Sequence, residues 1–166
     1  MAKSGRDRLD LNKEQVELMP LILEIIDKTY KPLLRSRGGD IVVDMKPETI
    51  SFVVDKLHIK NVISNLLDNA IKYCVRQPHI EIVCKEENNQ VIISIKDNGI
   101  GISKENLKNI FHKFYRIPTG NLHDVKGFGL GLNYVKLICK QHGGNIKVTS
   151  ELDKGSEFCI FIPKNN

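Results

Sequence analysis

The chain has 166 residues, which suits one domain with a sizeable core. Its formal charge is +5, from 25 Lys and Arg against 20 Asp and Glu, and this mild basicity fits an anionic ligand or an acidic partner. Because the basic residues are scattered and lack interleaved aromatics, the composition argues against nucleic-acid binding. No apolar run approaches the roughly 18 residues of a membrane span, so we expect no membrane contact by this chain.

The cysteines form no C-x-x-C pair, and at least three of them occupy expected core positions. We interpret them as small buried apolar side chains in a reducing compartment, not as disulfides or zinc ligands. Since no signal-peptide pattern is present either, a cytoplasmic location is expected. The four residues are Cys74, Cys84, Cys139 and Cys159.

The N-terminal part predicts an extended stretch and then a long helix. Residues 9–12 read as extended, and Asn12 is placed to cap the helix that follows. Helical periodicity continues to Leu34, although Pro20 and Pro32 predict a kink or an early end.

Six short apolar or alternating segments predict strands. The first two are joined by a turn at residues 46–48, so we expect the second to return beside the first. A turn at residues 87–89 joins the third and fourth, and one at residues 153–155 joins the last two. The predicted strands are residues 41–45, 50–54, 79–85, 91–96, 146–150 and 157–162.

Residues 55–73 predict a helix with two different faces, capped by Asp55. Apolar side chains recur at the i, i+3, i+4, i+7 spacing of a buried stripe. The other face is rich in Asn, a mediocre helix former. It is either a solvated surface or a set of carboxamide oxygens aimed at a cation or a polar ligand. Its residues are Asn61, Asn65, Asn69, Lys72 and Tyr73.

A loop with one carboxylate and two glycines follows the fourth predicted strand. Asp97 is either a turn cap or an acceptor for an exocyclic amine at the rim of a pocket. Gly99 and Gly101 allow another group to approach the backbone closely. Ser103 predicts the cap of a short helix over residues 104–111.

After that helix, Arg116 is either a surface charge or a ligand for a terminal phosphate. Residues 117–126 are polar and aperiodic, which predicts a mobile loop. Gly127, Gly129 and Gly131 then open the last predicted helix, after a loop rather than a strand, which argues against a dinucleotide-binding fold. Because exposed N–H groups at a helix start bind anions, the glycine run is either a phosphate site or a tightly packed hinge.

Taken in this order, the segments resemble the catalytic, ATP-binding domain of bacterial sensor histidine kinases, in the GHKL superfamily. The resemblance runs from about residue 9 to residue 163 and is far more specific than any one motif. The matching segments are residues 61–73, ending in NLLDNAIKY, for the N box, DNGIGI (97–102) for G1, FHKFYR (111–116) for F, GFGLGL (127–132) for G2 and KGSEFCIFIP (154–163) for G3.

The resemblance implies a role for each polar residue on the Asn-rich helix. Asn69 would be the Mg²⁺ ligand through its side-chain oxygen. Asn65 stands where hydrolytic relatives carry a Glu that activates water; since an amide is no general base, the site is expected to hold ATP without fast hydrolysis. Lys72 would contact the phosphates, and Tyr73 would pack near the adenine.

The other motifs would complete the ATP site. Asp97 would accept a hydrogen bond from the adenine N6 amine, and Arg116 would approach the γ-phosphate, so that Arg116 and Asn65 are the catalytic positions. Residues 102–126 would form the ATP lid. The residues expected to shape the pocket floor, the lid hinge and its packing are Gly99, Gly101, Gly127, Gly129, Leu130, Gly131 and Leu132.

Two departures from the family pattern matter. Phe128 stands where the family often has Thr or Ser, which affects how the lid packs but removes no obvious ligand. None of the five histidines has the context of the family's phosphoacceptor, so we expect that residue on a separate helical dimerisation domain. Residues 1–12 are then the end of a dimerisation region, a linker or residues from an expression vector, and residues 13–166 are the catalytic domain.

The predicted fold is an α/β two-layer sandwich, a mixed sheet with helices on one face. The predicted function is that of a histidine protein kinase, which binds Mg-ATP and donates its γ-phosphate to a His on the dimerisation domain. In a full-length homodimer, expected to be anchored in the bacterial inner membrane, the phosphoryl group would then pass to an Asp of a response-regulator receiver domain.

Three alternatives share parts of this pattern. A hydrolytic GHKL ATPase is disfavoured by Asn65. A kinase-like domain that only senses or scaffolds is disfavoured by the intact motifs. A Ser/Thr kinase of the anti-sigma-factor type fits the F box and the lid length less well.

Overall fold

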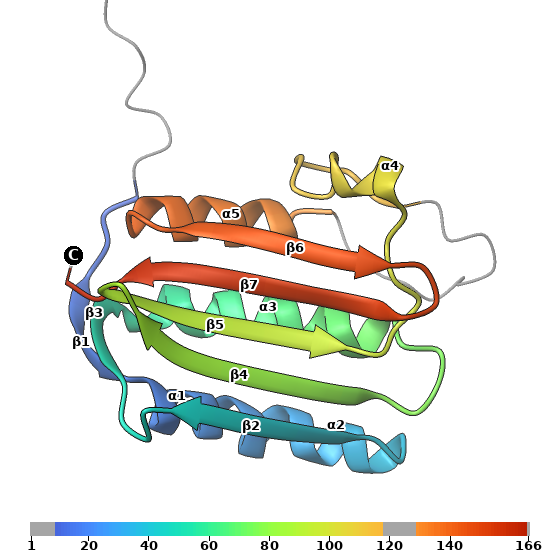
Figure 1. The fold of residues 1–166 in the computed structure, drawn as a ribbon, viewed down its shortest axis with the longest axis horizontal. Coiled ribbons are helices and arrows are strands. Elements are labelled where there is room, and N and C mark those ends of the chain that lie inside the picture. The colour runs from blue at the N-terminus through green and yellow to red at the C-terminus, as the bar shows by residue number, and fades with distance from the viewer. Residues whose placement is uncertain (1–8, 118–128, 166) are drawn as a thin grey trace, which may run out of the picture.

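The computed structural model describes residues 9–117 and 129–165, which form two layers (Figure 1). The main sheet consists of β2 (Asp40–Lys46), β4 (His79–Glu87), β5 (Gln90–Asp97), β7 (Gly155–Pro163) and β6 (Asn145–Glu151), in that spatial order. β2 runs parallel to β4, and the other neighbours are antiparallel. The helical segments are α1 (Leu18–Ile25), the π-helix η1 (Ile26–Tyr30), α2 (Lys31–Ser36), α3 (Lys56–Lys72), α4 (Lys104–Leu107) and α5 (Gly131–Gln141).

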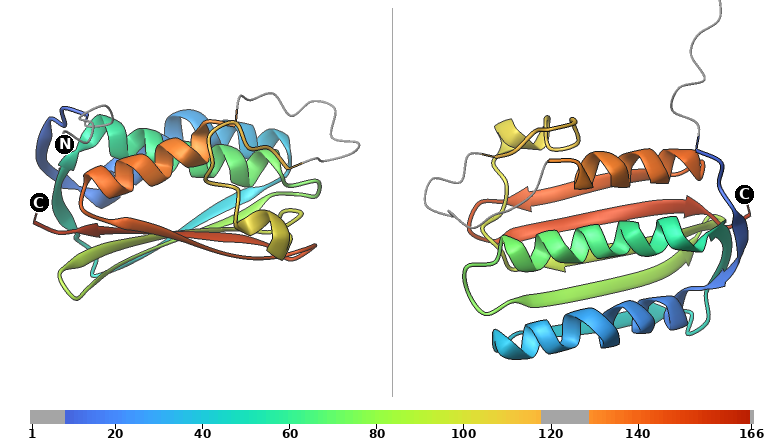
Figure 2. Two further views of the ribbon diagram at one scale, coloured as in Figure 1. Left: turned by 90° about the horizontal axis from the view of Figure 1, so that it is seen from above. Right: turned by 180° about the vertical axis from the view of Figure 1, so that it is seen from behind.

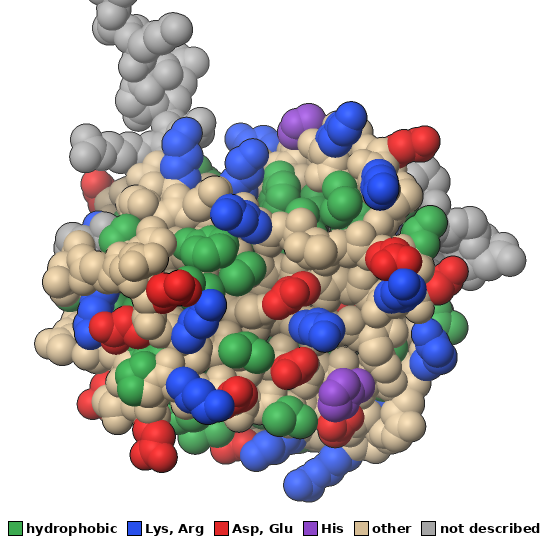
Figure 3. Space-filling view, viewed as in Figure 1, with side chains coloured by type: hydrophobic (Ala, Val, Ile, Leu, Met, Phe, Trp, Pro, Cys, Tyr) green, Lys and Arg blue, Asp and Glu red, His purple; other side chains and the backbone are tan. Residues whose placement is uncertain are grey.

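Helices α1, α2, α3 and α5 cover one face of this sheet (Figure 2), which confirms the predicted two-layer fold. The opposite face carries acidic, basic and apolar side chains intermixed (Figure 3). Among the described residues, no helix combines the length and apolarity that crossing a membrane requires.

The prediction of a helix directly after Asn12 is wrong. Residues 13–17 form a strand, β1 (Lys13–Glu17), which pairs antiparallel with β3 (Ser51–Asp55) in a separate two-stranded sheet. Asn12 therefore caps no helix; its backbone N–H donates to the Asp55 carboxylate over 2.8 Å. Pairing with β3 satisfies the backbone groups of this segment, and the helix begins only at Leu18.

The expected return of residues 50–54 beside residues 41–45 is also wrong. β3 pairs with β1, whereas β2 pairs in parallel with β4, which follows α3 in the chain. The turn at residues 46–48 thus carries the chain from one sheet to the other. Turn chemistry is local and predicts a change of direction, but the partner of a strand is decided by residues far away in sequence.

The two prolines of the first helical region do not end it. Pro20 lies in the first turn of α1, where its missing N–H would have no intrahelical partner. Before Pro32, the helix widens into the π-helical turn η1 and then continues as α2. In that turn the buried Tyr30 hydroxyl donates to the carboxylate of Asp68 over 2.8 Å and lies 3.0 Å from the Ser64 carbonyl oxygen, which fixes this region against α3.

α3 is the central helix of the covering layer, and its predicted cap and buried stripe are confirmed. The Asp55 side chain accepts a hydrogen bond from the His58 backbone N–H over 3.0 Å. The apolar stripe packs onto the sheet and lies in the core. Its buried residues are Ile59, Val62, Ile63, Leu66, Leu67, Ala70 and Ile71.

The β4–β5 hairpin positions one end of the site and is confirmed as predicted. Its turn residues Asn88 and Asn89 both have positive φ, at 50° and 59°, as tight hairpin turns require. Ser103 caps α4 as predicted, accepting from the Asn106 N–H over 3.4 Å, but α4 ends at Leu107 rather than at residue 111.

The predicted core positions of the cysteines are confirmed. Cys74, Cys84 and Cys139 are buried and Cys159 is half-buried.

Candidate functional site

One cavity of about 600 Å³ lies between the C-terminal half of α3, the loop after β5, the residues after α4 and the start of α5. Most of the predicted site residues line it, although they come from four separate segments. Those in its lining are Asn65, Asn69, Lys72, Tyr73, Asp97, Gly101, Arg116, Gly129, Leu130, Gly131 and Leu132. Gly127 lies outside the described residues, and so do residues 118–126 of the predicted lid.

The Asn-rich face of α3 forms one side of the cavity. The Asn65 side-chain N–H donates to the Asn61 carbonyl one turn earlier, over 2.8 Å. Its amide oxygen then faces the first turn of α5: a Cβ atom on Gly131 would lie 2.6 Å from it. A glycine at this position lets α5 begin against the Asn65 amide, with Asn69 one turn further along the same wall.

Two cationic side chains, Lys72 and Arg116, share this side of the cavity. Burial lowers the pKa of Lys72, and the nearby positive charge of Arg116 lowers it further. The Lys72 ammonium also lies 5.3 Å from the centre of the Tyr73 ring, within cation–π range. The Asp68 carboxylate, which lines the same cavity, opposes this lowering of the Lys72 pKa. Two positive charges at one cavity stabilise a bound anion.

Asp97 also lines the cavity, at the residue where β5 stops. Its Oδ1 accepts two backbone N–H bonds, from Gly99 over 2.8 Å and from Ser156 over 3.2 Å. Burial raises the pKa of Asp97, and these two hydrogen bonds oppose the rise. Within the described ranges both bonds go to Oδ1, which leaves Oδ2 available to a ligand that donates.

Gly99 and Gly101 hold the loop after Asp97 by close backbone contact. Gly99 is absent from the cavity lining; a Cβ on it would lie 2.8 Å from both Asp97 Oδ1 and the Tyr73 carbonyl oxygen. Gly101 has a φ of +70°, and a Cβ there would lie 2.0 Å from the Glu151 carbonyl oxygen. Both positions therefore require glycine for the loop to pack against α3 and β6.

Leu130 and Leu132 follow the undescribed segment. The Phe114 N–H donates to the Gly129 carbonyl over 3.0 Å, which joins the two chain stretches on either side of residues 118–128. Leu132 packs against the core, whereas Leu130 is 43% exposed at the cavity rim. The structure therefore shows core packing for Leu132 but not for Leu130.

Sequence reasoning missed the apolar walls and two polar residues of the cavity. The polar residues are Asp68, which accepts from Tyr30, and Ser156, beside Asp97. Ser156 lies within the KGSEFCIFIP segment, so that motif was the available signal. Most of the wall residues also lie within the motifs, but the motifs were interpreted through their polar residues and glycines, so the apolar ones were not predicted to line the cavity. They include Ile100, Ile102, Ile110, Tyr115 and Phe158.

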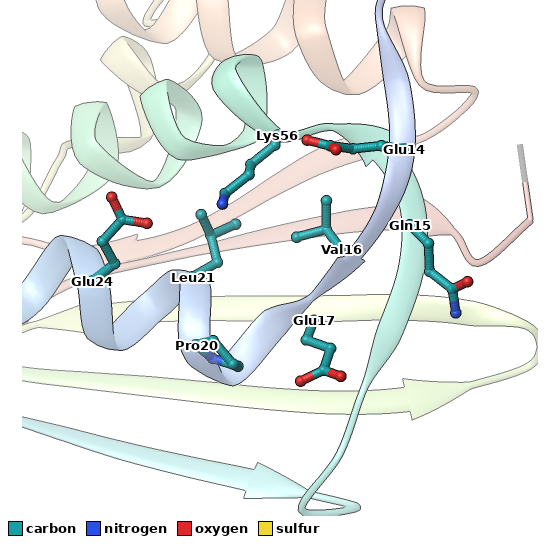
Figure 4. Close-up of a pocket in the computed structure, with 8 residues that line it drawn as sticks. All are labelled: Glu14, Gln15, Val16, Glu17, Pro20, Leu21, Glu24 and Lys56. Atoms are coloured by element: carbon teal, nitrogen blue, oxygen red, sulfur yellow. The ribbon is translucent and has the colours of Figure 1, made fainter.

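A second, smaller cavity of about 260 Å³ lies between β1, α1 and the start of α3 (Figure 4). Glu14 and Glu24 lie on opposite sides of it with Lys56 between them, and Glu17 lies at its base. Three carboxylates against one ammonium disfavour a polyphosphate here. The larger cavity has two cations, Lys72 and Arg116, against two carboxylates, Asp68 and Asp97, so its charge balance is the more favourable one for an anion.

The sequence matches one protein family over residues 54–166, described as "Histidine kinase-, DNA gyrase B-, and HSP90-like ATPase". The chain belongs to this family. A curated relative, the sensor protein RprX of Bacteroides fragilis, is 43% identical over 167 residues. That match covers 98% of this chain and 32% of RprX, so the chain spans about a third of the length of this relative.

Solved structures agree with the family assignment. The catalytic domain of histidine kinase ThkA superposes with a TM-score of 0.82 at 26% identity, over 93% of this chain and 97% of that domain. ThkA has also been solved in complex with the response regulator protein TrrA. Full-length ShkA in complex with AMPPNP has the same fold, with a TM-score of 0.83 at 22% identity over 94% of this chain and 32% of ShkA. The resemblance to histidine kinase catalytic domains is thereby confirmed.

Proposed function

We propose that this chain binds Mg-ATP in the larger cavity as the catalytic domain of a sensor histidine kinase. The observation that carries the proposal is the lining of the cavity, which combines the Asp97 carboxylate and apolar side chains with Lys72, Arg116 and an Asn-rich helix face. We assign a purine with an exocyclic amine to the Asp97 side, called the base end, and a polyphosphate to the side of Lys72 and Arg116, called the phosphate end.

At the base end, Asp97 accepts from the adenine N6 amine through Oδ2, while its Oδ1 stays bonded to backbone N–H groups. Tyr73 and the apolar side chains of Ile100 and Phe158 supply the surfaces for the purine ring. Gly101 brings the loop close enough to complete this end, and Gly99 holds the carboxylate in place.

At the phosphate end, Lys72 and Arg116 offset the negative charge, with Arg116 nearest the γ-phosphate. The first turn of α5, reached through Gly129, Leu130 and Gly131, adds backbone N–H groups at a helix N-terminus. The prediction of Gly127 as part of the lid hinge stays a proposal, as does the packing role of Leu132.

The residues present fit a magnesium ion held mainly by phosphates. The described residues contain no group of three or more His, Cys, Asp or Glu side chains that could hold a metal. Asn69 instead offers one carboxamide oxygen at the phosphate end, and Mg²⁺ prefers oxygen ligands and keeps several waters. When bound, the ion neutralises phosphate charge. Asn65 is no general base, so ATP is held for transfer rather than hydrolysed.

The remaining parts of the proposal concern a full-length sensor kinase that contains this chain as its catalytic domain. Residues 13–166 are the catalytic domain and residues 102–126 its ATP lid. The γ-phosphate passes to a His on a separate dimerisation domain of a homodimer, and then to an Asp of a receiver domain. The sensor name of RprX and the ThkA–TrrA complex support this scheme. A cytoplasmic catalytic domain with a membrane anchor elsewhere in the protein stays a prediction.

Calorimetric titration of the chain with ADP, with and without Mg²⁺, tests the proposed function. We expect Mg²⁺ to tighten binding, and Asn69→Ala to reduce that magnesium effect by about tenfold, since one direct ligand is lost. Asn145→Ala, the same substitution at an exposed position on β6, is the matched control. Absence of ADP binding, or rapid Mg-dependent ATP hydrolysis that Asn69→Ala abolishes, contradicts the proposal.

A further inference from the structure

A serine outside the cavity lining holds the base end together. Ser150, near the C-terminal end of β6, is half-buried beside the G1 loop and the β6–β7 turn. Its hydroxyl oxygen has three partners: the Ile102 N–H at 2.8 Å, the Gly155 carbonyl oxygen at 2.8 Å, and the Ser156 hydroxyl at 2.9 Å. These contacts come from three different stretches of chain.

The direction of each of these hydrogen bonds follows from proton counting. A hydroxyl has one proton and two lone pairs. The Ile102 N–H only donates, so it uses one lone pair of Ser150; the Gly155 carbonyl only accepts, so it takes the Ser150 proton. The remaining lone pair of Ser150 must then accept from Ser156. Ser156 is thereby fixed as a donor toward Ser150, away from the ligand.

The consequence for the cavity is that Ser156 and Asp97 both present hydrogen-bond acceptors to a ligand. Ser156 is buried and lines the cavity, and its only proton is directed to Ser150. Its oxygen therefore offers lone pairs to a ligand. Asp97, whose Oδ1 already accepts from the Ser156 N–H, likewise offers only acceptor capacity at Oδ2 when ionised. Two adjacent acceptors face the same end of the cavity.

We propose that Ser150 is a positioning residue that sets the purine specificity of the site, by holding the Ser156 hydroxyl as an acceptor. A 6-amino purine brings two N–H protons to this end, directly or through a bridging water. A 6-oxo purine brings an acceptor oxygen against two acceptors, which leaves buried polar groups unpaired. The inference rests on the proposed function, which places the base at Asp97.

The test compares ADP with inosine diphosphate, by calorimetry on the whole chain. Inosine diphosphate carries an oxygen in place of the 6-amino group and a proton on N1. Wild-type protein is expected to prefer ADP by about thirtyfold, because unpaired buried polar groups are costly. In Ser150→Ala the Ser156 proton is released and can turn toward O6. ADP binding is then expected to weaken by about fivefold, and binding of inosine diphosphate to tighten by about threefold. General damage to the pocket would weaken both.

Three further variants make the result decisive. Ser150→Thr keeps the hydroxyl and is expected to restore the wild-type preference. Ser94→Ala removes a serine hydroxyl that bonds Glu157 at 2.5 Å and lies outside the cavity lining; its preference should equal that of wild type. In a Ser156→Ala background, Ser150→Ala should change the preference no further, because the group it orients is gone.

The outcomes separate this inference from the proposed function. If wild-type protein binds neither nucleotide, the proposed function fails. If it binds ADP but Ser150→Ala keeps the full preference for ADP, or weakens both nucleotides equally while Ser150→Thr behaves the same way, the proposed role of Ser150 is overturned and the adenine site stands.

Discussion

The two ends of the cavity are built by different means. At the base end, Asp97, Gly99, Ser156 and Ser150 are connected by hydrogen bonds between side chains and backbone N–H groups or hydroxyls. At the phosphate end, Lys72 and Arg116 face one cavity as like charges, and burial together with Arg116 lowers the pKa of Lys72. In the proposed site, base recognition therefore depends on a rigid fold, whereas phosphate recognition depends on charge.

This difference predicts how substitutions behave. A change at the base end that moves backbone disturbs the fold itself, because β5, β6 and β7 meet there. A change at the phosphate end alters binding and leaves the sheet untouched.

The largest expected effect is at Gly101. In Gly101→Ala, the new Cβ would lie 2.0 Å from a backbone oxygen at a φ of +70°. We expect a loss of about 3 kcal/mol in the free energy of unfolding, from steric strain, measured by urea denaturation. Gly131→Ala is the matched control at the phosphate end: its Cβ meets a side-chain oxygen, Asn65 Oδ1. It should change stability by less than about 1 kcal/mol and still weaken ADP binding. Equal losses of unfolding free energy in the two variants would contradict the proposed difference between the base end and the phosphate end.

The next largest expected effects come from one substitution at each end, each measured with two ligands. Asp97→Asn should weaken ADP by about thirtyfold, roughly 2 kcal/mol for a hydrogen bond to a charged group, and leave inorganic triphosphate nearly unchanged. Lys72→Ala should weaken both ligands by about tenfold, with a loss that shrinks at high salt. Calorimetry at two ionic strengths measures all four affinities. Losses for triphosphate in Asp97→Asn that match those for ADP would contradict the separation of base and phosphate ends.

The smallest expected effect is a pH dependence confined to the base end. Burial raises the pKa of Asp97 above its ordinary value, so this carboxylate gains a proton at a higher pH than an exposed one. Below the raised pKa the carboxylate loses acceptor capacity, and wild-type protein approaches the behaviour of Asp97→Asn. The ratio of their ADP affinities should therefore narrow as the pH falls toward the raised pKa, and this narrowing should begin at a higher pH than an ordinary Asp would give. A ratio that stays constant down to the ordinary Asp range would contradict the raised pKa of Asp97.

Some features of this protein were determined by local sequence. The stripe from Ile59 to Ile71 predicted the buried face of α3, because helical periodicity needs only neighbouring residues. Asp55 as a cap and Asn88-Asn89 as a hairpin turn follow from side-chain and backbone chemistry within a few positions. The ordered motifs around Asn69, Asp97 and Gly131 likewise identified the family, since each carries its own short-range pattern.

Other features were decided only by the tertiary structure. Residues 13–17 became strand β1 because β3 was available to pair with them, and β2 joined β4 rather than β3. The relay from Ile102 through Ser150 to Ser156 joins positions 48 and 6 residues apart, and no periodicity or motif links them. Strand pairing and the direction of these hydrogen bonds depend on which residues, distant in sequence, come into contact in the fold. A single sequence predicts the elements and the family, but not those long-range contacts.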